Sequence, residues 1–128
     1  MKKLLNLIVV AISVATLISG LVQMFAPGFV LNFVGAQTTA TAAHFFAIIG
    51  MFMALFGGLM LHTIYSASGN RTAILWCAFQ KFGAFVAVGL GVMNGIFSSV
   101  ALAVAFFDLI SAILFFYYFK SVNLDENY

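Results

Sequence analysis

Two ionisable residues, Lys81 and Asp108, interrupt apolar stretches that are long enough to cross a membrane. A charged side chain inside a bilayer costs about 2.5–3.5 kcal/mol on insertion scales, so it needs a partner or a water-filled cavity. The two residues are equally far in sequence from the turn expected at Asn94-Gly95, which places both roughly 20 Å from that turn at about 1.5 Å per residue. The sequence therefore predicts a buried charge pair at one depth on two neighbouring helices.

Such a pair has two possible roles. It can fix the register and rotation of its two helices, or it can form a proton or ion relay or a substrate-binding centre, because intramembrane ionisable residues often mark such pathways. Four further residues are candidate auxiliary polar groups of this site: His62, Gln80, Ser111 and Asn94. His62 continues the line of small residues on its helix, so we expect it to point toward a neighbouring helix, as a packing or a titrating residue.

The sequence carries no motif for metal or cofactor chemistry. It has no Walker, GxGxxG, HExxH or GxSxG pattern, and its single cysteine, Cys77, excludes an intrachain disulfide and a CxxC site. His44 and His62 are about five helical turns apart, roughly 27 Å, which is too far to bind one metal ion or one haem. We therefore predict no metal site and no cofactor. A nucleic-acid partner is also excluded, because there is no basic stripe.

Apolar helices must position these residues. The chain has 128 residues, of which 65% are hydrophobic and 6% charged, whereas a soluble domain carries roughly 25% charged residues. A bilayer core of about 30 Å is crossed by roughly 20 helical residues, and the apolar runs show none of the alternation of a barrel strand. We predict an all-α fold, a single transmembrane domain over residues 1–128, with antiparallel helices at about 4–25, 44–65, 72–93 and 98–119.

The predicted connections differ in length. Two are short, Ser66–Arg71 and Asn94–Phe97, and force their helices to be antiparallel neighbours. The first connection is longer: Pro27-Gly28 ends the first helix, Phe29–Val34 is expected as a short amphipathic helical turn in the membrane interface, and Gln37–Thr41 as a loop. A cleavable secretory signal is disfavoured, because the first apolar run continues well past its possible cleavage site.

The cations outside the spans predict the orientation. They lie before the first span, between the second and third, and after the fourth, at Lys2, Lys3, Arg71 and Lys120. By the positive-inside rule, both termini and the middle connection face the cytoplasm. Aromatic residues that favour membrane interfaces agree with this orientation: Tyr65, Trp76, Tyr117 and Tyr118. The sequence thus predicts a protein integral to the cytoplasmic (inner) membrane, with its N- and C-termini inside.

Small residues at intervals of four predict close helix contacts. One ridge comprises Gly50, Ala54 and Gly58, and another comprises Gly83, Ala87 and Gly91. Ridges of this kind let helix backbones approach closely in lipid. The second ridge lies around the helix from Lys81, so this helix could touch two neighbours, one of them another subunit. The first span carries a mild polar stripe, interpreted as packing rather than as a solute path: Ser13, Thr16, Gly20 and Gln23.

The stretch Gly20–Gly35 (GLVQMFAPGFVLNFVG), followed by Gly50–Leu61 (GMFMALFGGLML), resembles the DoxX-like superfamily. These are small four-helix bacterial membrane proteins with a proline-ended first helix and an outer loop closed by glycine. The resemblance implies a four-helix bundle and a role as accessory subunit of a membrane oxidoreductase. Relatives often carry an arginine in the second helix, where this chain has His44 and His62.

Three functions are compatible with these features. The first is a non-enzymatic membrane protein, either a homo-oligomer or an accessory subunit of a membrane-protein partner in the lipid bilayer. The second is a small proton- or ion-coupled transporter or channel centred on Lys81 and Asp108. The third is a membrane enzyme acting on a lipid or quinone, with His62 and the charge pair as acid–base groups.

Overall fold

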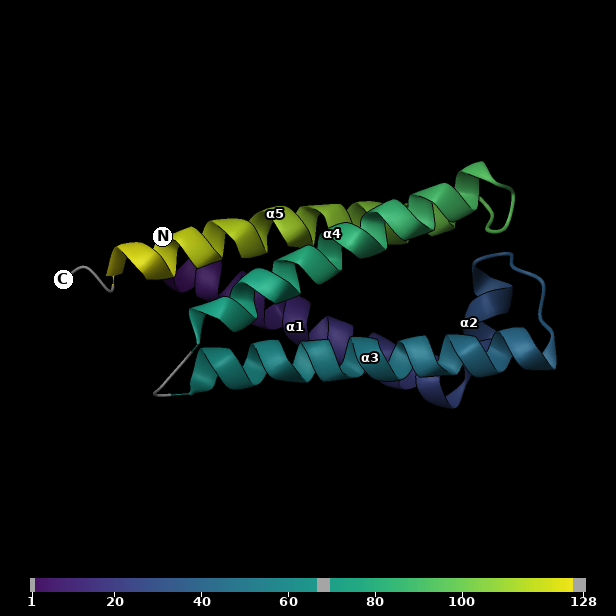
Figure 1. The fold of residues 1–128 in the computed structure, drawn as a ribbon, viewed down its shortest axis with the longest axis horizontal. Coiled ribbons are helices and arrows are strands. Elements are labelled where there is room, and N and C mark those ends of the chain that lie inside the picture. The colour runs from purple at the N-terminus through teal and green to yellow at the C-terminus, as the bar shows by residue number, and fades with distance from the viewer. Residues whose placement is uncertain (1, 67–69, 126–128) are drawn as a thin grey trace.

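The computed structural model describes residues 2–66 and 70–125, the last three of these without their side chains. These residues form five α-helices: α1 (Lys2–Phe25), α2 (Pro27–Phe33), α3 (Ala40–Tyr65), α4 (Arg71–Met93) and α5 (Ala101–Asp125) (Figure 1). No strand occurs in the described ranges. Four helices are long and apolar enough to cross a membrane: Lys2–Phe25, Ala40–Tyr65, Arg71–Met93 and Ala101–Val122. The all-α class and the four apolar helices predicted from the sequence are confirmed.

Several boundaries differ from the prediction. Helix α3 begins at Ala40 rather than near His44, because the Thr39 side chain caps it by accepting from the Ala42 amide at 3.1 Å. The expected loop at Gln37–Thr41 is therefore wrong in its last two residues. Helix α5 begins at Ala101 rather than at 98 and continues to Asp125 rather than ending near 119. The predicted connection at 66–71 lies partly outside the described residues.

The chain between α1 and α3 contains the short helix α2. It begins at Pro27, whose fixed φ and missing N–H suit the first position of a helix. Leu31 and Val34 are buried against the rest of the molecule, while Phe29 and Phe33 are exposed. A helix in this segment was expected from its apolar pattern. Gly35, just after α2, has φ +71°, a left-handed conformation that glycine adopts without strain.

The long helices form two pairs: α1 packs mainly on α3, and α4 packs mainly on α5 (Figure 1). The α1–α3 pair is held at very short range by small residues. A Cβ added to Gly20 would lie 2.5 Å from the backbone nitrogen of Ala54, and one added to Gly50 would lie 2.7 Å from that of Met24. Backbone contacts of this kind are typical of small-residue helix interfaces in membranes.

The predicted α3 ridge is wrong at its third residue. An added Cβ at Gly58 meets no described atom within 4 Å, whereas one at Gly57 would lie 2.7 Å from the backbone nitrogen of Leu17. The reason is helical geometry: at 3.6 residues per turn, two successive steps of four drift around the helix, while a step of four followed by a step of three returns to the same face. The contact face of α3 is therefore Gly50, Ala54 and Gly57.

The predicted α4 ridge has a different setting at each of its three residues. Gly83 is exposed and an added Cβ there meets open space within the described chain, and Ala87 is also exposed. Gly91 is buried and lies against the ring of Phe97. The ridge therefore does not form one continuous contact face: Gly83 faces open space, whereas Ala87 lines a cavity between the two helix pairs.

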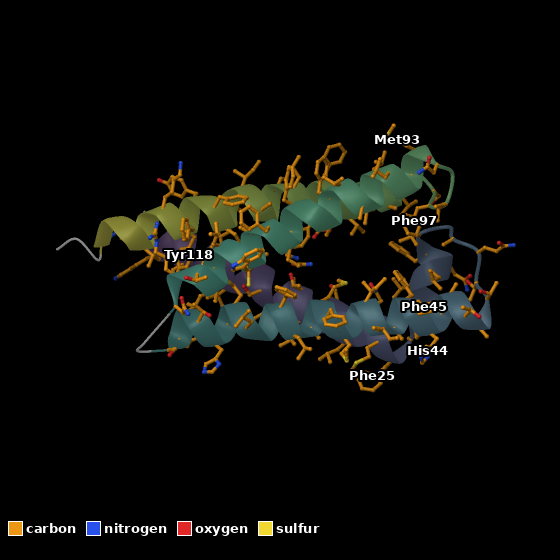
Figure 2. All side chains as sticks on the ribbon, in the orientation of Figure 1. Phe25, His44, Phe45, Met93, Phe97 and Tyr118 are labelled. Carbon is orange, nitrogen blue, oxygen red and sulfur yellow. The ribbon has the colours of Figure 1, made fainter. Side chains whose placement is uncertain are left out.

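The two pairs are joined differently at their two ends. Where α1 begins and α5 ends, the pairs share a core that includes Val9, Met60, Cys77 and Phe115. Tyr118 lies at this end in Figure 2, and its hydroxyl lies 3.3 Å from Oδ1 of Asn6 on α1.

The opposite end is joined by the backbone carbonyl of Val34, which accepts from the amide of Ser98 at 2.8 Å and from its Oγ at 3.1 Å. Phe97, the neighbour of Ser98, is labelled at this end in Figure 2. We call this the Val34–Ser98 contact. It also explains why α5 starts late, since Ser98 bonds to the α2 segment before the helix begins.

Candidate functional site

Lys81 on α4 and Asp108 on α5 form the ion pair predicted from the sequence. Nζ of Lys81 lies 3.4 Å from Oδ1 of Asp108, and the residues are 3% and 8% exposed. The helices carry small residues around the pair, which allow close approach. On α5 the buried small residues are Ala101, Ala105, Ser111 and Ala112, and on α4 they include Cys77 and Ala78.

A residue from the other helix pair completes the site. Nζ of Lys81 donates to Oγ1 of Thr16 on α1 at 2.6 Å, and Thr16 in turn donates to the carbonyl of Ile12 at 2.8 Å. A threonine hydroxyl can do both, because it has one donor and two acceptor lone pairs. Nζ of Lys81 also lies over the ring of Phe107, 5.3 Å from the ring centroid, which is close enough for a cation–π interaction.

Sequence reasoning did not assign Thr16 to the site. It placed Thr16 on a polar stripe used for packing, and the stripe is indeed buried along α1. Ser13 donates to the carbonyl of Val9, and Gln23 donates to the carbonyl of Phe46 at 3.0 Å. The sequence does contain one indication of this contact. Thr16 lies near the middle of its span, as Lys81 does, so the two residues are expected at a similar depth.

A cavity of about 780 Å³ lies between the two helix pairs and reaches Lys81 and Asp108. Its volume is within the roughly 300–1,000 Å³ of ordinary ligand sites. The polar residues that line it are Thr16, Ser19, Gln23, Gln80, Lys81 and Asp108. The rest of the wall is apolar and comes from all five helices together with Val34 and Phe97. The site thus combines an apolar chamber with one charged, hydrogen-bonding region.

A second, much smaller cavity adjoins the same residues. It has about 10 Å³ and shares Thr16, Gln80 and Lys81 with the large cavity, but extends toward Cys77 and Phe115 in the shared core. This volume is close to the minimum that holds one water molecule, but the surface facing it is apolar and offers such a water no hydrogen-bond partner.

The auxiliary candidates have different positions. Gln80 lines both cavities beside Lys81. Ser111 is buried next to Asp108 on α5, but it donates to the carbonyl of Phe107 at 2.7 Å, within its own helix. Asn94 is exposed at the C-terminal cap of α4, at the end of the helix.

The two histidines do not belong to the site. His62 is exposed, so the expectation that it points toward a neighbouring helix is wrong. The cause is the same as for Gly58, because the contact face of α3 passes through Gly57. His44 is exposed near the start of α3, far from Tyr118 in Figure 2. Within the described part of the chain, no three His, Cys, Asp or Glu side chains are grouped to hold a metal ion.

Comparison with known proteins adds no relative. No family model, no curated protein and no solved structure matches the chain. The chemistry of the site therefore follows from its own geometry. A cation, a carboxylate and a hydroxyl meet beside an apolar chamber, and this arrangement can hold and orient the polar group of an otherwise apolar molecule.

Proposed function

We propose that the chain is an integral protein of the bacterial inner membrane, an antiparallel four-helix bundle with both termini in the cytoplasm. The four long apolar helices and the positions of the cations at their ends support this topology. It is testable with single cysteines in a Cys77→Ser background. An impermeant maleimide applied to intact spheroplasts should label Asn94→Cys, and should label Lys120→Cys only after permeabilisation. The reverse pattern would contradict the orientation.

We propose that the protein is a non-enzymatic membrane protein that binds a small amphipathic molecule from the bilayer. The observation that carries this proposal is the cavity of about 780 Å³, whose apolar walls meet Lys81, Asp108 and Thr16. A membrane enzyme is less well supported, because its expected acid–base residue, His62, is exposed away from the cavity. The protein that binds this molecule would be a homo-oligomer or an accessory subunit, and the DoxX-like resemblance favours the accessory role.

Native mass spectrometry of protein released from nanodiscs tests the binding function. The wild type should retain an amphiphile. Val88→Trp should lose it, because Val88 lines the cavity and the larger ring fills it. Val86→Trp is the matched control on the same helix, since Val86 is exposed and does not line the cavity. Equal adducts on both variants, or none on the wild type, would contradict the proposal.

The same spectra test the oligomeric part of the proposal. The exposed Gly83 gives α4 a position without a described neighbour, at which another helix could pack closely. We expect a complex of two or more subunits, or a complex with a partner. A protein that stays a lone monomer under these gentle conditions would contradict this part and leave amphiphile binding in place.

A proton- or ion-coupled transporter is the second candidate. It is favoured by one specific observation, that cavities of very different size adjoin the same Lys81. Reconstituted vesicles should then show a pH-dependent flux that Asp108→Asn abolishes. An absence of flux for protons and common ions, in vesicles whose protein still binds its amphiphile, would exclude this candidate.

A further inference from the structure

The charged region of the large cavity has no net formal charge. It contains one cation, Lys81, and one anion, Asp108, with 3.4 Å between Nζ and Oδ1. The other polar residues of the described lining are neutral amides and hydroxyls: Thr16, Ser19, Gln23 and Gln80. An anionic head group brought to Lys81 would also meet Asp108, and a cationic one would meet Lys81. Little water separates charges in such a place, so like-charge repulsion is poorly screened.

The same residues can both donate hydrogen bonds to a neutral polar group and accept hydrogen bonds from it. An ammonium has three donors, and Thr16 and Asp108 account for two of those on Lys81. The Asp108 carboxylate accepts several hydrogen bonds, and the Gln80 amide both donates and accepts. A hydroxyl, which also donates and accepts, can therefore bond to Lys81 and Asp108 together. A carbonyl can accept from Lys81 or Gln80.

The apolar walls suit a hydrocarbon chain. Valines from four helices line them, among them Val22, Val30, Val88 and Val104. The cavity is open rather than sealed, and two further lining residues on α1 and α3, Ile18 and Ile49, are 56% and 52% exposed. The cavity therefore communicates with the surroundings of the helices, which in a membrane are acyl chains. Its volume of about 780 Å³ suits one chain with a small head.

We infer that the cavity takes an uncharged, single-chain amphiphile, a long-chain alcohol or a monoacylglycerol, with its hydroxyl or carbonyl oxygens at Lys81 and Asp108 and its chain along the valine-lined wall. This inference rests on the proposed amphiphile-binding function and specifies its ligand class. A fatty acid and a long-chain amine share the chain and differ in the charge of the head, so they are the discriminating comparisons.

The experiment titrates the intact protein in nanodiscs of neutral lipid with monooleoylglycerol, oleate and oleylamine, and reads occupancy by native mass spectrometry. Half-occupancy by monooleoylglycerol should need at least about tenfold less ligand than half-occupancy by either charged compound, a difference of about 1.4 kcal/mol. Equal or tighter binding of oleate or oleylamine would overturn the ligand class and leave the binding function standing. Binding of none of the three, with no adduct retained from the membrane, would overturn the binding function itself.

A charge variant tests where the head group lies. Asp108→Asn leaves Lys81 as the only charge in the described lining, so the preference should move toward oleate by about tenfold relative to monooleoylglycerol. Val86→Trp should keep the wild-type order of the three compounds. An unchanged order in a folded Asp108→Asn protein would overturn the assignment of the head group to the ion pair. If that variant does not fold, the wild-type series still decides the ligand class.

Discussion

Lys81 donates to Thr16 at 2.6 Å, and this bond crosses from one helix pair to the other. The ion pair with Asp108, at 3.4 Å, lies within the α4–α5 pair. The charge predicted to join two neighbouring helices therefore also holds α1 against them. A single ammonium connects both halves of the chain at the inner wall of the cavity.

Removing the Thr16 hydroxyl should therefore destabilise the protein. Thr16→Val keeps the shape of the side chain but leaves the buried ammonium without one partner, which should cost about 1.5–3 kcal/mol. Thr16→Ser keeps a hydroxyl and should retain most of the stability. The measurement is the free energy of unfolding in one detergent, with Thr63→Val on α3 as the control. Equal losses in the Val and Ser variants would contradict the role given to this bond.

Lys81 and Asp108 should be strongly coupled in a double-mutant cycle. Lys81→Met and Asp108→Leu each leave one buried charge unpaired, and each should lower the free energy of unfolding by about 3–5 kcal/mol. The double variant removes both charges and should be more stable than either single variant. The cycle is read from unfolding of the four proteins in the same detergent. Losses that simply add would show that the two side chains act independently.

Adjacent glycines on α3 should respond in opposite ways to alanine. Gly57→Ala would place a methyl 2.7 Å from the backbone nitrogen of Leu17 and 2.9 Å from the carbonyl of Ser13, so α1 and α3 must separate. We expect a loss of about 1–3 kcal/mol. Gly58→Ala meets open space and should be neutral or stabilise by up to about 1 kcal/mol, because alanine favours the helix. Comparable losses in the two variants would contradict the contact face.

Alanine variants of two glycines in left-handed conformations distinguish the cost of backbone strain from the cost of a steric collision at the Val34–Ser98 contact. Gly35 has φ +71° and Gly95 has φ +72°, so alanine should cost about 1–2 kcal/mol of strain at either position. Only at Gly35 would the new methyl also collide with the side chain of Ser98, at 2.6 Å from its Cβ. Gly35→Ala should therefore be clearly the more destabilising in thermal unfolding. Equal effects would mean that Ser98 moves away freely.

The four long apolar helices and the ion pair could be predicted because they depend on local quantities. Hydropathy identifies an apolar helix without reference to its neighbours. Equal sequence distances from one turn place Lys81 and Asp108 at one depth, and the structure confirms that they pair. The short helix after α1 is local in the same sense, although it begins at Pro27 rather than at the predicted Phe29, since proline suits the first position of a helix.

The contact face of α3, the bond from Lys81 to Thr16 and the cavity could not be predicted, because they depend on how each helix is rotated about its axis. Helices α3 and α5 are apolar on nearly every side, so their residue pattern does not single out the face that packs. For this reason Gly58 and His62 were assigned to the contact face in place of Gly57. The partnership of Thr16 with Lys81 and the cavity between the pairs arise from the docking of two pairs, which no single segment encodes.

The division into two helix pairs also follows the order in which the chain is synthesised. Residues 2–65 contain the whole α1–α3 pair, and residues 71–125 contain the whole α4–α5 pair. Because the chain is synthesised from its N-terminus, all of α1 and α3 leaves the ribosome before Lys81 does, and Lys81 leaves before Asp108. The hydroxyl acceptor of Lys81 is therefore available to it before its counter-charge, which follows on the next helix.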